Sequence, residues 1–470
     1  MTGQNLVPQG SVAARVCRFV QGRSVRAYLV GGYVRDRLLG RESHDVDFAV
    51  EGDALGLART VADWMRGAFV PLDDERGTGR VVTRDEHGQR LFVDFAVLQG
   101  RDITVDLSRR DFTIDAIALD INDLSRFIDP YDGRGDLEAG LVRAVSEVAF
   151  RDDPLRTLRA VRLAAELGLR VEPRTEELIR RDAGLIAAVS AERVRDELSK
   201  TLAQPGAADN LRYLDELGLL GVILPETEGV KEAGRFERSL EMVTALEHLY
   251  AILLPSPISN LPSPISILHS DRLLSHLSQF TSGDRQRRVL LKLVAFLCGG
   301  EGNQRDSAAR LVGLALRRLR FSRGEVNLGR AIVAHRGRLG QLRAAEAVTR
   351  RDVYRFFRDT GKAGLDLLLL FLADQLAAQG MGLDLDQIGA TVLWEEDLQF
   401  AAALLRDYYE RHAEVISPPK LISGDDLKQT FGLEEGPRLG EVLEAVREAQ
   451  AAGEIRTRRE ALDYVERVWL

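Results

Sequence analysis

Two aspartates one residue apart, Asp45 and Asp47, stand in the apolar segment "DVDFAV". In a β-strand the side chains alternate between faces, so both carboxylates point to one face and the apolar residues to the other. Two carboxylates on one face repel each other unless a cation lies between them. Mg²⁺ is usually held by one or two carboxylates together with substrate phosphates. A bare pair of this kind is more often the polar edge of a surface strand.

Residues suited to phosphate binding precede the two aspartates. Gly31 and Gly32 lie in "LVGGYVRD", where an apolar, β-rich segment turns into a predicted helix. Glycine lets the backbone approach a ligand closely, and the N–H groups at a helix start attract phosphate oxygens. Arg35 follows in the first helical turn and can pair with a phosphate. A tight turn alone would explain the glycines, but the combination predicts a site for a nucleoside triphosphate and its metal ions.

Two further segments carry side chains of related chemistry. Asp94, in "LFVDFAV", lies on a predicted strand and is a candidate third carboxylate, as a base or as a metal ligand. A solvent-facing aspartate on an edge strand explains it equally well. Arg109 and Arg110 precede the apolar run of "RRDFTIDAIALD". Arginines beside a triphosphate stabilise the charge that develops on its oxygens during nucleotidyl transfer.

A charged helix face follows in "DDPLRTLRAVR". Its charged residues recur every third position and spread across one broad side of a helix: Asp153, Arg156, Arg159 and Arg162. An exposed basic face with an N-terminal aspartate has the same periodicity, so the spacing alone assigns no function.

The elements that must position these side chains change character along the chain. Strand patterns occupy residues 25–30, 45–50, 79–84 and 89–98, with a helical pattern at 54–67. They predict a small sheet flanked by helices. After about residue 150 helical periodicity takes over, as at 153–169 and 190–203. The sequence therefore predicts an α/β head followed by a long helical region.

The composition excludes several classes of protein. The 470 residues are 45% hydrophobic and 29% charged, which is typical of a folded soluble protein. The longest apolar runs are shorter than the ~18 residues that a bilayer span needs. The N-terminus lacks the pattern of a signal peptide. Two cysteines are too few for a disulfide framework or a zinc site. We therefore expect a cytoplasmic protein with no membrane partner.

The motifs quoted above, followed by "SAERVRDEL", occur in an order that resembles bacterial class II tRNA nucleotidyltransferases. That family comprises the CCA-adding enzymes and their poly(A) polymerase relatives. The segment at 421–455 is also similar to the C-terminal part of the family. The resemblance implies a polymerase-β-like α/β nucleotidyltransferase head followed by an all-α neck, body and tail. The implied borders are 1–145 for the head, 146–225 for the neck, 226–415 for the body and 416–470 for a tRNA-binding tail.

The resemblance also implies a role for each candidate residue. Asp45 and Asp47 would bind two Mg²⁺ ions that align the tRNA 3′-hydroxyl for attack on CTP or ATP. The implied nucleotide-binding residues are Gly32, Arg35 and Arg110 at the triphosphate, Asp153 and Arg156 at the base, and Arg159 and Arg162 in support.

The implied base-reading pair has a physical rationale. Cytosine and adenine both present an amino donor beside a ring acceptor, which suit the Asp153 carboxylate and the Arg156 guanidinium. Guanine and uracil present a carbonyl where the amino group would be, so the carboxylate would face another acceptor. One Asp/Arg pair could therefore admit C and A without a template.

Two departures from the family pattern bear on specificity. Asp115 stands where "RRDFTIN" usually has asparagine, with no assignable effect from sequence. Only about ten residues separate Gln99 from Arg110, where full CCA-adding relatives usually have a longer flexible stretch. This shortening resembles enzymes that add only the two cytidines. A poly(A) polymerase acting on other RNA, and an RNA-binding protein with an inactive head, remain as alternatives.

The helical region raises three further expectations. The body resembles an HD-type phosphohydrolase domain, but Leu297-Cys298-Gly299 replaces the expected His-Asp pair, so we expect no hydrolase activity. "LPSPIS" occurs at 254–259 and again at 261–266, which predicts an irregular Pro-rich insertion. Residues 310–362 hold fourteen Lys/Arg against four Asp/Glu. Such a basic stretch could grip the tRNA acceptor arm, although solvated helix faces have the same composition.

Overall fold

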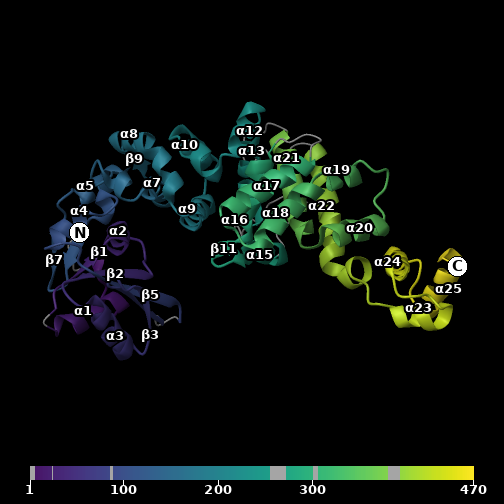
Figure 1. The fold of residues 1–470 in the computed structure, drawn as a ribbon, viewed down its shortest axis with the longest axis horizontal. Helices are drawn as coiled ribbons and strands as arrows, with labels where there is room; N and C mark the ends of the chain where they lie inside the picture. Colours follow the sequence, from purple (N-terminus) through teal and green to yellow (C-terminus); the bar gives the residue numbers. More distant parts are fainter. Residues whose placement is uncertain are drawn as a thin grey trace. The chain divides into compact units, whose positions relative to one another are not determined.

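The computed structural model describes residues 6–23, 25–84, 88–253, 271–299, 305–378 and 392–469. Two compact units divide the chain: unit 1 comprises Met1–Thr201 and Tyr213–Ile223, and unit 2 comprises Leu202–Arg212 and Leu224–Leu470. The main strands lie in the purple and blue ribbon, and the teal to yellow ribbon is almost entirely helical (Figure 1). This confirms the predicted α/β head followed by a helical region. The four-part division into head, neck, body and tail is finer than these two units and remains a proposal.

Unit 1 is built on a seven-stranded mixed sheet with the order β3-β4-β5-β2-β1-β6-β7. β2 and β5 are parallel, and the other neighbouring strands are antiparallel. The strands are β1 (Ala27–Val30), β2 (Asp45–Val50), β3 (Ala68–Asp73), β4 (Thr78–Arg84), β5 (Arg90–Val97), β6 (Ala118–Asp120) and β7 (Asp123–Ile128). The first helices are α1 (Val12–Gln21), α2 (Gly32–Leu38), α3 (Ala54–Met65), α4 (Ile103–Ser108), η2 (Thr113–Asp115) and α5 (Gly133–Ala139).

The two faces of the sheet differ in polarity around β2. Phe48 stacks on Phe95 with ring centroids 5.0 Å apart on the face that α3 covers. On the opposite face, a buried cluster joins Val30 and Ala49 to Leu107 of α4. Asp45 and Asp47 lie on that second face, at the start of β2. The alternation predicted from "DVDFAV" is therefore present, and it leaves both carboxylates beside the apolar cluster.

The elements after the sheet include the charged helix predicted from "DDPLRTLRAVR". They are β8 (Leu141–Val142), α6 (Ala149–Asp152), α7 (Arg156–Leu167), β9 (Arg170–Val171), α8 (Pro173–Asp182), η3 (Ala183–Ala188), α9 (Ala191–Ala203), α10 (Ala207–Glu216) and α11 (Leu220–Ile223). The helix α7 ends at Gly168, which adopts a left-handed conformation with φ of 70°. Glycine reaches this conformation without the penalty that other residues incur, so the predicted helix end is explained.

In the residues that the structure describes, unit 2 is helical apart from one short strand pair. Its elements are α12 (Thr227–Glu232), α13 (Phe236–Leu253), α15 (Asp271–Ser278), β10 (Phe280–Ser282), β11 (Arg285–Gln286), α16 (Arg287–Cys298), α17 (Arg305–Arg318), α18 (Arg323–His335), α19 (Gly337–Arg343), α20 (Arg350–Thr360), η5 (Gly361–Ala363), α21 (Gly364–Ala378), α22 (Val392–Glu410), η6 (His412–Ile416), α23 (Gly424–Phe431), α24 (Pro437–Ala452) and α25 (Arg458–Trp469). The Pro-rich repeat at 254–266 lies outside the described residues.

The region with HD-like sequence holds a buried ion pair. Leu297 and Cys298 are buried at the end of α16. On the same helix, Arg287 donates to Asp366 of α21 at 2.7 Å, and His276 lies 3.3 Å from the same carboxylate. A buried carboxylate needs such partners because an unpaired charge is costly away from water. In the described part of the chain, no three His, Cys, Asp or Glu side chains are grouped to hold a metal ion.

Candidate active site

Asp45 and Asp47 project from the first three residues of β2. Asp45 is exposed and Asp47 is half-buried. Within the described residues, neither carboxylate accepts a hydrogen bond or forms an ion pair. Burial and the neighbouring Asp94 carboxylate raise the pKa of Asp47 to about 7, against the opposing charge of Arg110. Two adjacent carboxylates without an internal partner fit a divalent cation, which would remove the cost of their charge.

Asp94 lies beside Asp47 but has a partner of its own. The parallel register places it opposite Asp47, and the antiparallel register places it opposite Arg80. Both oxygens of Asp94 accept hydrogen bonds from Arg80 at 2.8 Å. Since this bidentate pair occupies the carboxylate, Asp94 is less suited to bind a metal ion or to act as a base than Asp47 is. Its third-carboxylate role stays a prediction.

Gly31 brings Arg110 close to Asp47. Its φ is 68°, and a Cβ at this position would lie 2.8 Å from Arg110 Nη1 and 3.7 Å from Asp47 Oδ2. Any other residue would therefore displace the arginine and strain the backbone. Asp106 holds the other side of the Arg110 guanidinium, at 3.2 Å from Nη2. The glycine predicted to cradle a phosphate thus also positions a guanidinium beside the carboxylates.

Arg35 is buried against two carboxylates. Its Nη1 donates to Asp115 at 2.6 Å and its Nε to Asp36 at 2.9 Å, and only 8% of the side chain is exposed. Burial disfavours the charge of Arg35, but Asp115 and Asp36 outweigh it and raise the pKa of the guanidinium. The aspartate that replaces the usual asparagine therefore neutralises the arginine expected to hold the triphosphate.

We expect Asp115→Asn to lower the KM for the nucleotide by roughly 3- to 10-fold, about 1 kcal/mol. The amide oxygen can still accept a hydrogen bond from Arg35, but the negative charge that also acts on Asp47 is gone. Steady-state kinetics with Asp120→Asn as a control would check this, because Asp120 lies on β6 without contacting Arg35. An unchanged or higher KM in Asp115→Asn alone would contradict the account.

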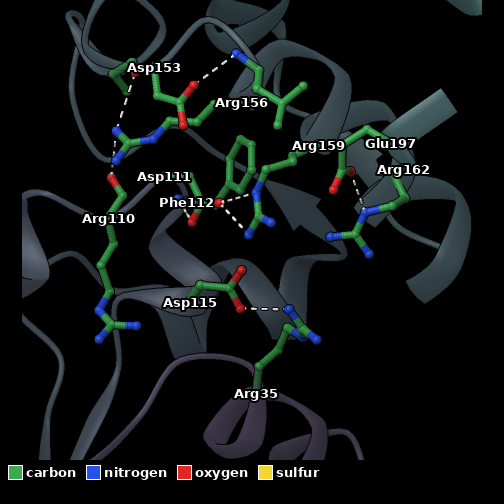
Figure 2. A network of polar contacts seen from close by, with 12 residues as sticks. Arg35, Arg110, Asp111, Phe112, Asp115, Asp153, Arg156, Arg159, Arg162 and Glu197 are labelled. Atoms are coloured by element: carbon green, nitrogen blue, oxygen red, sulfur yellow. Dashed lines mark hydrogen bonds and ion pairs between the residues drawn. The ribbon is translucent and has the colours of Figure 1, made fainter. Parts of the chain in front are cut away.

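The segment that begins at Arg109 joins the sheet to α7. The guanidinium of Arg156 donates to the carbonyl of Arg109 at 2.6 Å and to that of Ala149 at 3.2 Å. Arg159 donates to the Asp111 carboxylate at 2.8 Å. Figure 2 shows the Arg159–Asp111 pair beside Arg156, with Arg110 and Asp115 on the same segment as Asp111. One short stretch therefore carries a residue beside Asp47 and also fixes α7.

The Asp153 carboxylate contacts an arginine that is not among the site residues predicted from the sequence. Its Oδ1 accepts from the backbone N–H of Leu155 at 3.2 Å, and its Oδ2 accepts from Arg193 of α9 at 2.8 Å. Among the described residues no side-chain hydrogen bond joins Asp153 to Arg156, whose guanidinium is used on backbone carbonyls. The two residues are linked only through the main chain, where the Arg156 N–H donates to the Asp153 carbonyl at 3.0 Å. Arg193 is thus the guanidinium that contacts the predicted base-reading carboxylate.

Arg162 joins α7 to α9 through its ion pairs, whereas Arg156 and Arg159 contact the 109–111 segment. It donates to Glu197 of α9 at 2.8 Å and pairs with Glu166 on its own helix. Only 13% of the side chain is exposed. The every-third-residue pattern therefore divides into two arginines bound to the 109–111 segment, Arg156 and Arg159, and one that packs α7 on α9.

The short segment after Gln99 is an ordered helix. Asp102 caps α4 by accepting from the Val105 N–H at 3.0 Å. Asp106, buried within α4, accepts from the Gln99 N–H at 2.9 Å and also holds Arg110. The segment between Gln99 and Arg110, which looked short in the sequence, is thus compact. The Asp106 carboxylate binds the residue at each of its ends.

Sequence reasoning missed three residues of this arrangement: Asp106, Asp111 and Arg193. Asp111 and Arg193 stand inside the quoted motifs, but a single charge has no periodicity that indicates its partner. Asp106 at four residues before Arg110 has the spacing of a helical ion pair, and this signal was available in the sequence.

Three family profiles match successive parts of the chain. They are described as "Poly A polymerase head domain" at residues 27–143, "Probable RNA and SrmB- binding site of polymerase A" at 168–230, and "tRNA nucleotidyltransferase domain 2 putative" at 316–465. Among the described residues, no helix is both long and apolar enough to cross a membrane.

Curated relatives match over nearly the full length. An A-adding tRNA nucleotidyltransferase of Deinococcus radiodurans is 36% identical, over 94% of this chain and 95% of that protein. A CC-adding tRNA nucleotidyltransferase of Geobacter sulfurreducens is 32% identical, over 93% of this chain and 91% of that protein. The solved Thermotoga maritima CCA-adding enzyme complexed with tRNA covers 99% of this chain and 98% of its own, with a TM-score of 0.65 and 22% identity. That last match shows the fold.

The profiles follow the order of the sequence motifs, and the relatives share about a third of their residues with this chain from end to end. The chain therefore belongs to the family of class II tRNA nucleotidyltransferases and poly(A) polymerases.

Proposed function

We propose that this chain adds CMP or AMP to the 3′ end of tRNA without a template, using CTP or ATP. The main support for this proposal comes from Gly31. Asp47 and Arg110 both have atoms within 4 Å of the position that a Cβ would occupy on this glycine. This places a carboxylate that has no partner among the described residues next to a guanidinium, an arrangement suited to transfer of a nucleotidyl group from a triphosphate. The full-length similarity to tRNA nucleotidyltransferases supports tRNA as the RNA substrate.

Asp45 and Asp47 are proposed to hold Mg²⁺. Their oxygens are hard ligands, and they project from one strand face without an internal partner among the described residues. When bound, the metal ions would stabilise charge on the phosphates and activate the RNA 3′-hydroxyl. The part that the chain itself plays is to keep two carboxylates side by side on a rigid strand, backed by the stacked Phe48 and Phe95.

The triphosphate is proposed to lie along Gly32 and Arg110, with Arg35 acting on it through its charge. Arg110 is held by Asp106, which leaves its Nη1 beside Gly31 and the carboxylates. A guanidinium fixed in this way loses little freedom when it binds a phosphate. Arg35 is buried between Asp36 and Asp115, so its proposed part is to balance charge beneath the site and not to grip a phosphate directly.

Base selection is proposed for Asp153, with Arg156 fixing the helix start beside it. An ionised carboxylate accepts hydrogen bonds and donates none, so it pairs with the amino group of cytosine or adenine. Arg156 ties the start of α7 to the carbonyls of Arg109 and Ala149. Arg159 and Arg162 support the nucleotide indirectly, through their ion pairs with Asp111 and Glu197.

We propose addition of the two cytidines as the specific reaction. The compact, capped helix between Gln99 and Arg110 favours it, because a tied segment cannot provide the flexible stretch associated with the change from CTP to ATP. Addition of the terminal adenosine is the second candidate, on the 36% identity with an A-adding enzyme. A poly(A) polymerase acting on other RNA is the third, because the head profile carries that description.

One assay separates these reactions. Purified protein receives tRNAs that end before CCA, after the first C, or after both Cs, with labelled CTP or ATP and Mg²⁺. CTP incorporation on the first two substrates alone supports CC addition, and ATP incorporation on the third alone supports A addition. Incorporation of both CTP and ATP supports synthesis of the full CCA end. Long ATP tails on an unrelated RNA would instead identify a poly(A) polymerase, and no incorporation on any RNA would reject the enzyme.

We propose that the four parts of the chain have separate roles. The head at 1–145 carries the metal and triphosphate site, the neck at 146–225 the base-reading helix, the body at 226–415 the scaffold, and the tail at 416–470 a tRNA-binding surface. The tail helices have a small core of their own, formed around Leu427, Val446 and Val465. A cytoplasmic location remains a prediction from the sequence.

A further inference from the structure

A groove of about 420 Å³ runs between α17 and α18 in unit 2. Its lining combines small and cationic side chains: Ala309, Arg310, Asn327, Arg330, Ala331 and Ala334. Alanine side chains leave the backbone of both helices close to the groove, while two guanidinium groups and an amide supply hydrogen-bond donors. Among the described side chains that line this groove none is acidic, so their chemistry is that of an anion site.

One arginine of this groove, Arg330, meets Arg317 at Gly313 of α17. A Cβ at Gly313 would lie 2.8 Å from Cδ of Arg330 and 3.5 Å from Nη1 of Arg317. The aliphatic part of the Arg330 side chain therefore packs on α17 at Gly313, where the helix has no side chain. Arg310 and Arg317 lie three residues before and four residues after Gly313, on the same face of α17. Arg330 and Arg317 therefore both reach the position of Gly313, and Arg310 lies about one turn away on the same face of α17.

Most arginines of the basic stretch 310–362 have a carboxylate partner. The pairs are Arg318–Glu226, Arg336–Asp374, Arg338–Asp359, Arg343–Glu396, Arg350–Glu414, Arg351–Glu448, Arg355–Glu448 and Arg358–Asp359. The large local charge excess seen in the sequence is therefore mostly balanced by acids from other helices. These paired arginines stabilise the packing of unit 2 and are not available as a uniform basic surface.

Arg310, Arg317 and Arg330 differ from that majority. In the part of the chain that the structure describes, none of the three forms an ion pair or donates a hydrogen bond to a carboxylate. Like charges that converge without a counter-charge repel each other, and an anion between them converts this repulsion into attraction. The guanidinium fork matches the oxygens of a phosphate.

We propose that the α17–α18 groove binds a phosphodiester of the tRNA backbone. The inference rests on the proposed function, which supplies RNA as the substrate, and it narrows the binding role of the 310–362 stretch to Arg310, Arg317 and Arg330. The arginines contact phosphate oxygens, the alanine-lined floor admits the RNA backbone, and Asn327 is placed to donate to a phosphate or a ribose hydroxyl. Such a contact positions RNA without reading its sequence.

The test compares two double variants of the full chain. Arg310→Gln/Arg330→Gln removes two unpaired charges, and Arg338→Gln/Arg358→Gln removes two charges that are already balanced by Asp359. Affinity for a tRNA that lacks CCA is measured by fluorescence anisotropy at several salt concentrations. Loss of two phosphate contacts should reduce the slope of log K against log salt by about 1.5. The affinity of the groove variant should fall about 10-fold at low salt, with kcat at saturating tRNA unchanged.

Two checks exclude an effect on folding. Thermal melts should show that the groove variant is as stable as the wild type, because its arginines have no carboxylate to leave unpaired among the described residues. The Arg310→Lys/Arg330→Lys variant keeps both charges and should recover most of the salt slope.

The outcomes separate this proposal from the proposed function. If the wild type extends tRNA and the groove variant keeps its affinity and its salt slope, the groove proposal is wrong and the function stands. Equal losses in the groove and control variants would also overturn it, because a general charge effect would explain them. If the wild type neither binds nor extends tRNA, the proposed function fails, and the groove proposal fails with it.

Discussion

Asp47→Asn should lower kcat by about 10³-fold, because a metal ion contributes several kcal/mol of charge stabilisation and each 1.36 kcal/mol is tenfold in rate. Asp47 has the best placement for a metal ligand: it is half-buried, unpartnered among the described residues, and adjacent to Arg110. The asparagine amide keeps the shape of the side chain but supplies no charge. Single-turnover incorporation of labelled nucleotide measures the loss directly.

Three measurements show whether this loss arises from the metal site. The tRNA affinity of Asp47→Asn should stay within about 2-fold of the wild type, because the substituted group touches the reaction centre and not the RNA body. Mg²⁺ should raise the melting temperature of the wild type, since a ligand that binds only the folded state stabilises it. The variant should lack this rise, and its melting temperature without Mg²⁺ should not fall, because one of three neighbouring carboxylate charges is gone.

Asp94→Asn provides the matched comparison. It lies on the adjacent strand in register with Asp47, but Arg80 holds both of its oxygens. We expect a loss of about 10-fold or less, through a shift of Arg80 and not through loss of a metal ligand. Equal losses in the two variants would mean that Asp94 breaks its pair with Arg80 and binds the metal ion. Asp94 would then be the third carboxylate predicted as an alternative from the sequence.

The alternation of side chains on a strand made the Asp45 and Asp47 arrangement predictable. The strands at 45–50, 79–84 and 89–98 correspond to β2, β4 and β5 for the same reason, because their apolar residues pack on one face. β3 and β7 escaped prediction because they are sheet edges without a buried residue, and β3 also contains Pro71. The interior strand β6 was missed as well, although two of its three residues are buried, because so short a segment shows no alternation. Local pattern therefore predicts the longer buried strands well, and short strands and exposed edges poorly.

The partners of the charged residues could not be predicted in this way. The three-residue spacing of Arg156, Arg159 and Arg162 indicates a shared helix side, but their partners come from other segments. Arg35 illustrates the same limit, because its burial depends on Asp115, eighty residues further along the chain. Periodicity reports which side of an element a residue occupies, and only the tertiary fold decides which carboxylate or carbonyl it meets.

Asp153→Asn should reduce the preference for CTP over UTP by about 10²-fold or more, since a site built around a hydrogen bond discriminates strongly against a ligand that lacks it. The ionised carboxylate rejects uracil because two acceptors would face each other, whereas an amide can turn its NH₂ toward the carbonyl. Competition between labelled CTP and UTP on a tRNA that lacks CCA gives the ratio of kcat/KM values for the two nucleotides.

Arg193→Gln tests the contact that sequence reasoning missed. Arg193 holds Oδ2 of Asp153 at 2.8 Å, while the Leu155 N–H holds Oδ1, so the carboxylate is fixed from both sides. We expect a selectivity loss of about 10-fold, mainly through a higher KM for CTP, because a carboxylate free to rotate aligns less well with the base. Arg193→Lys keeps the charge and should restore part of the preference.

Arg174→Gln is the control for a surface ion pair of the same kind. Arg174 and Arg193 are each 53% exposed, and each lies 2.8 Å from its carboxylate, but Arg174 pairs with Glu147, away from the predicted base site. If Arg193→Gln lowered kcat/KM equally for CTP and UTP, Arg193 would only stabilise the neck. An unchanged CTP preference in Asp153→Asn would place base selection elsewhere. A graded loss, large for Asp153 and smaller for Arg193, requires that the carboxylate reads the base and that α9 sets its orientation.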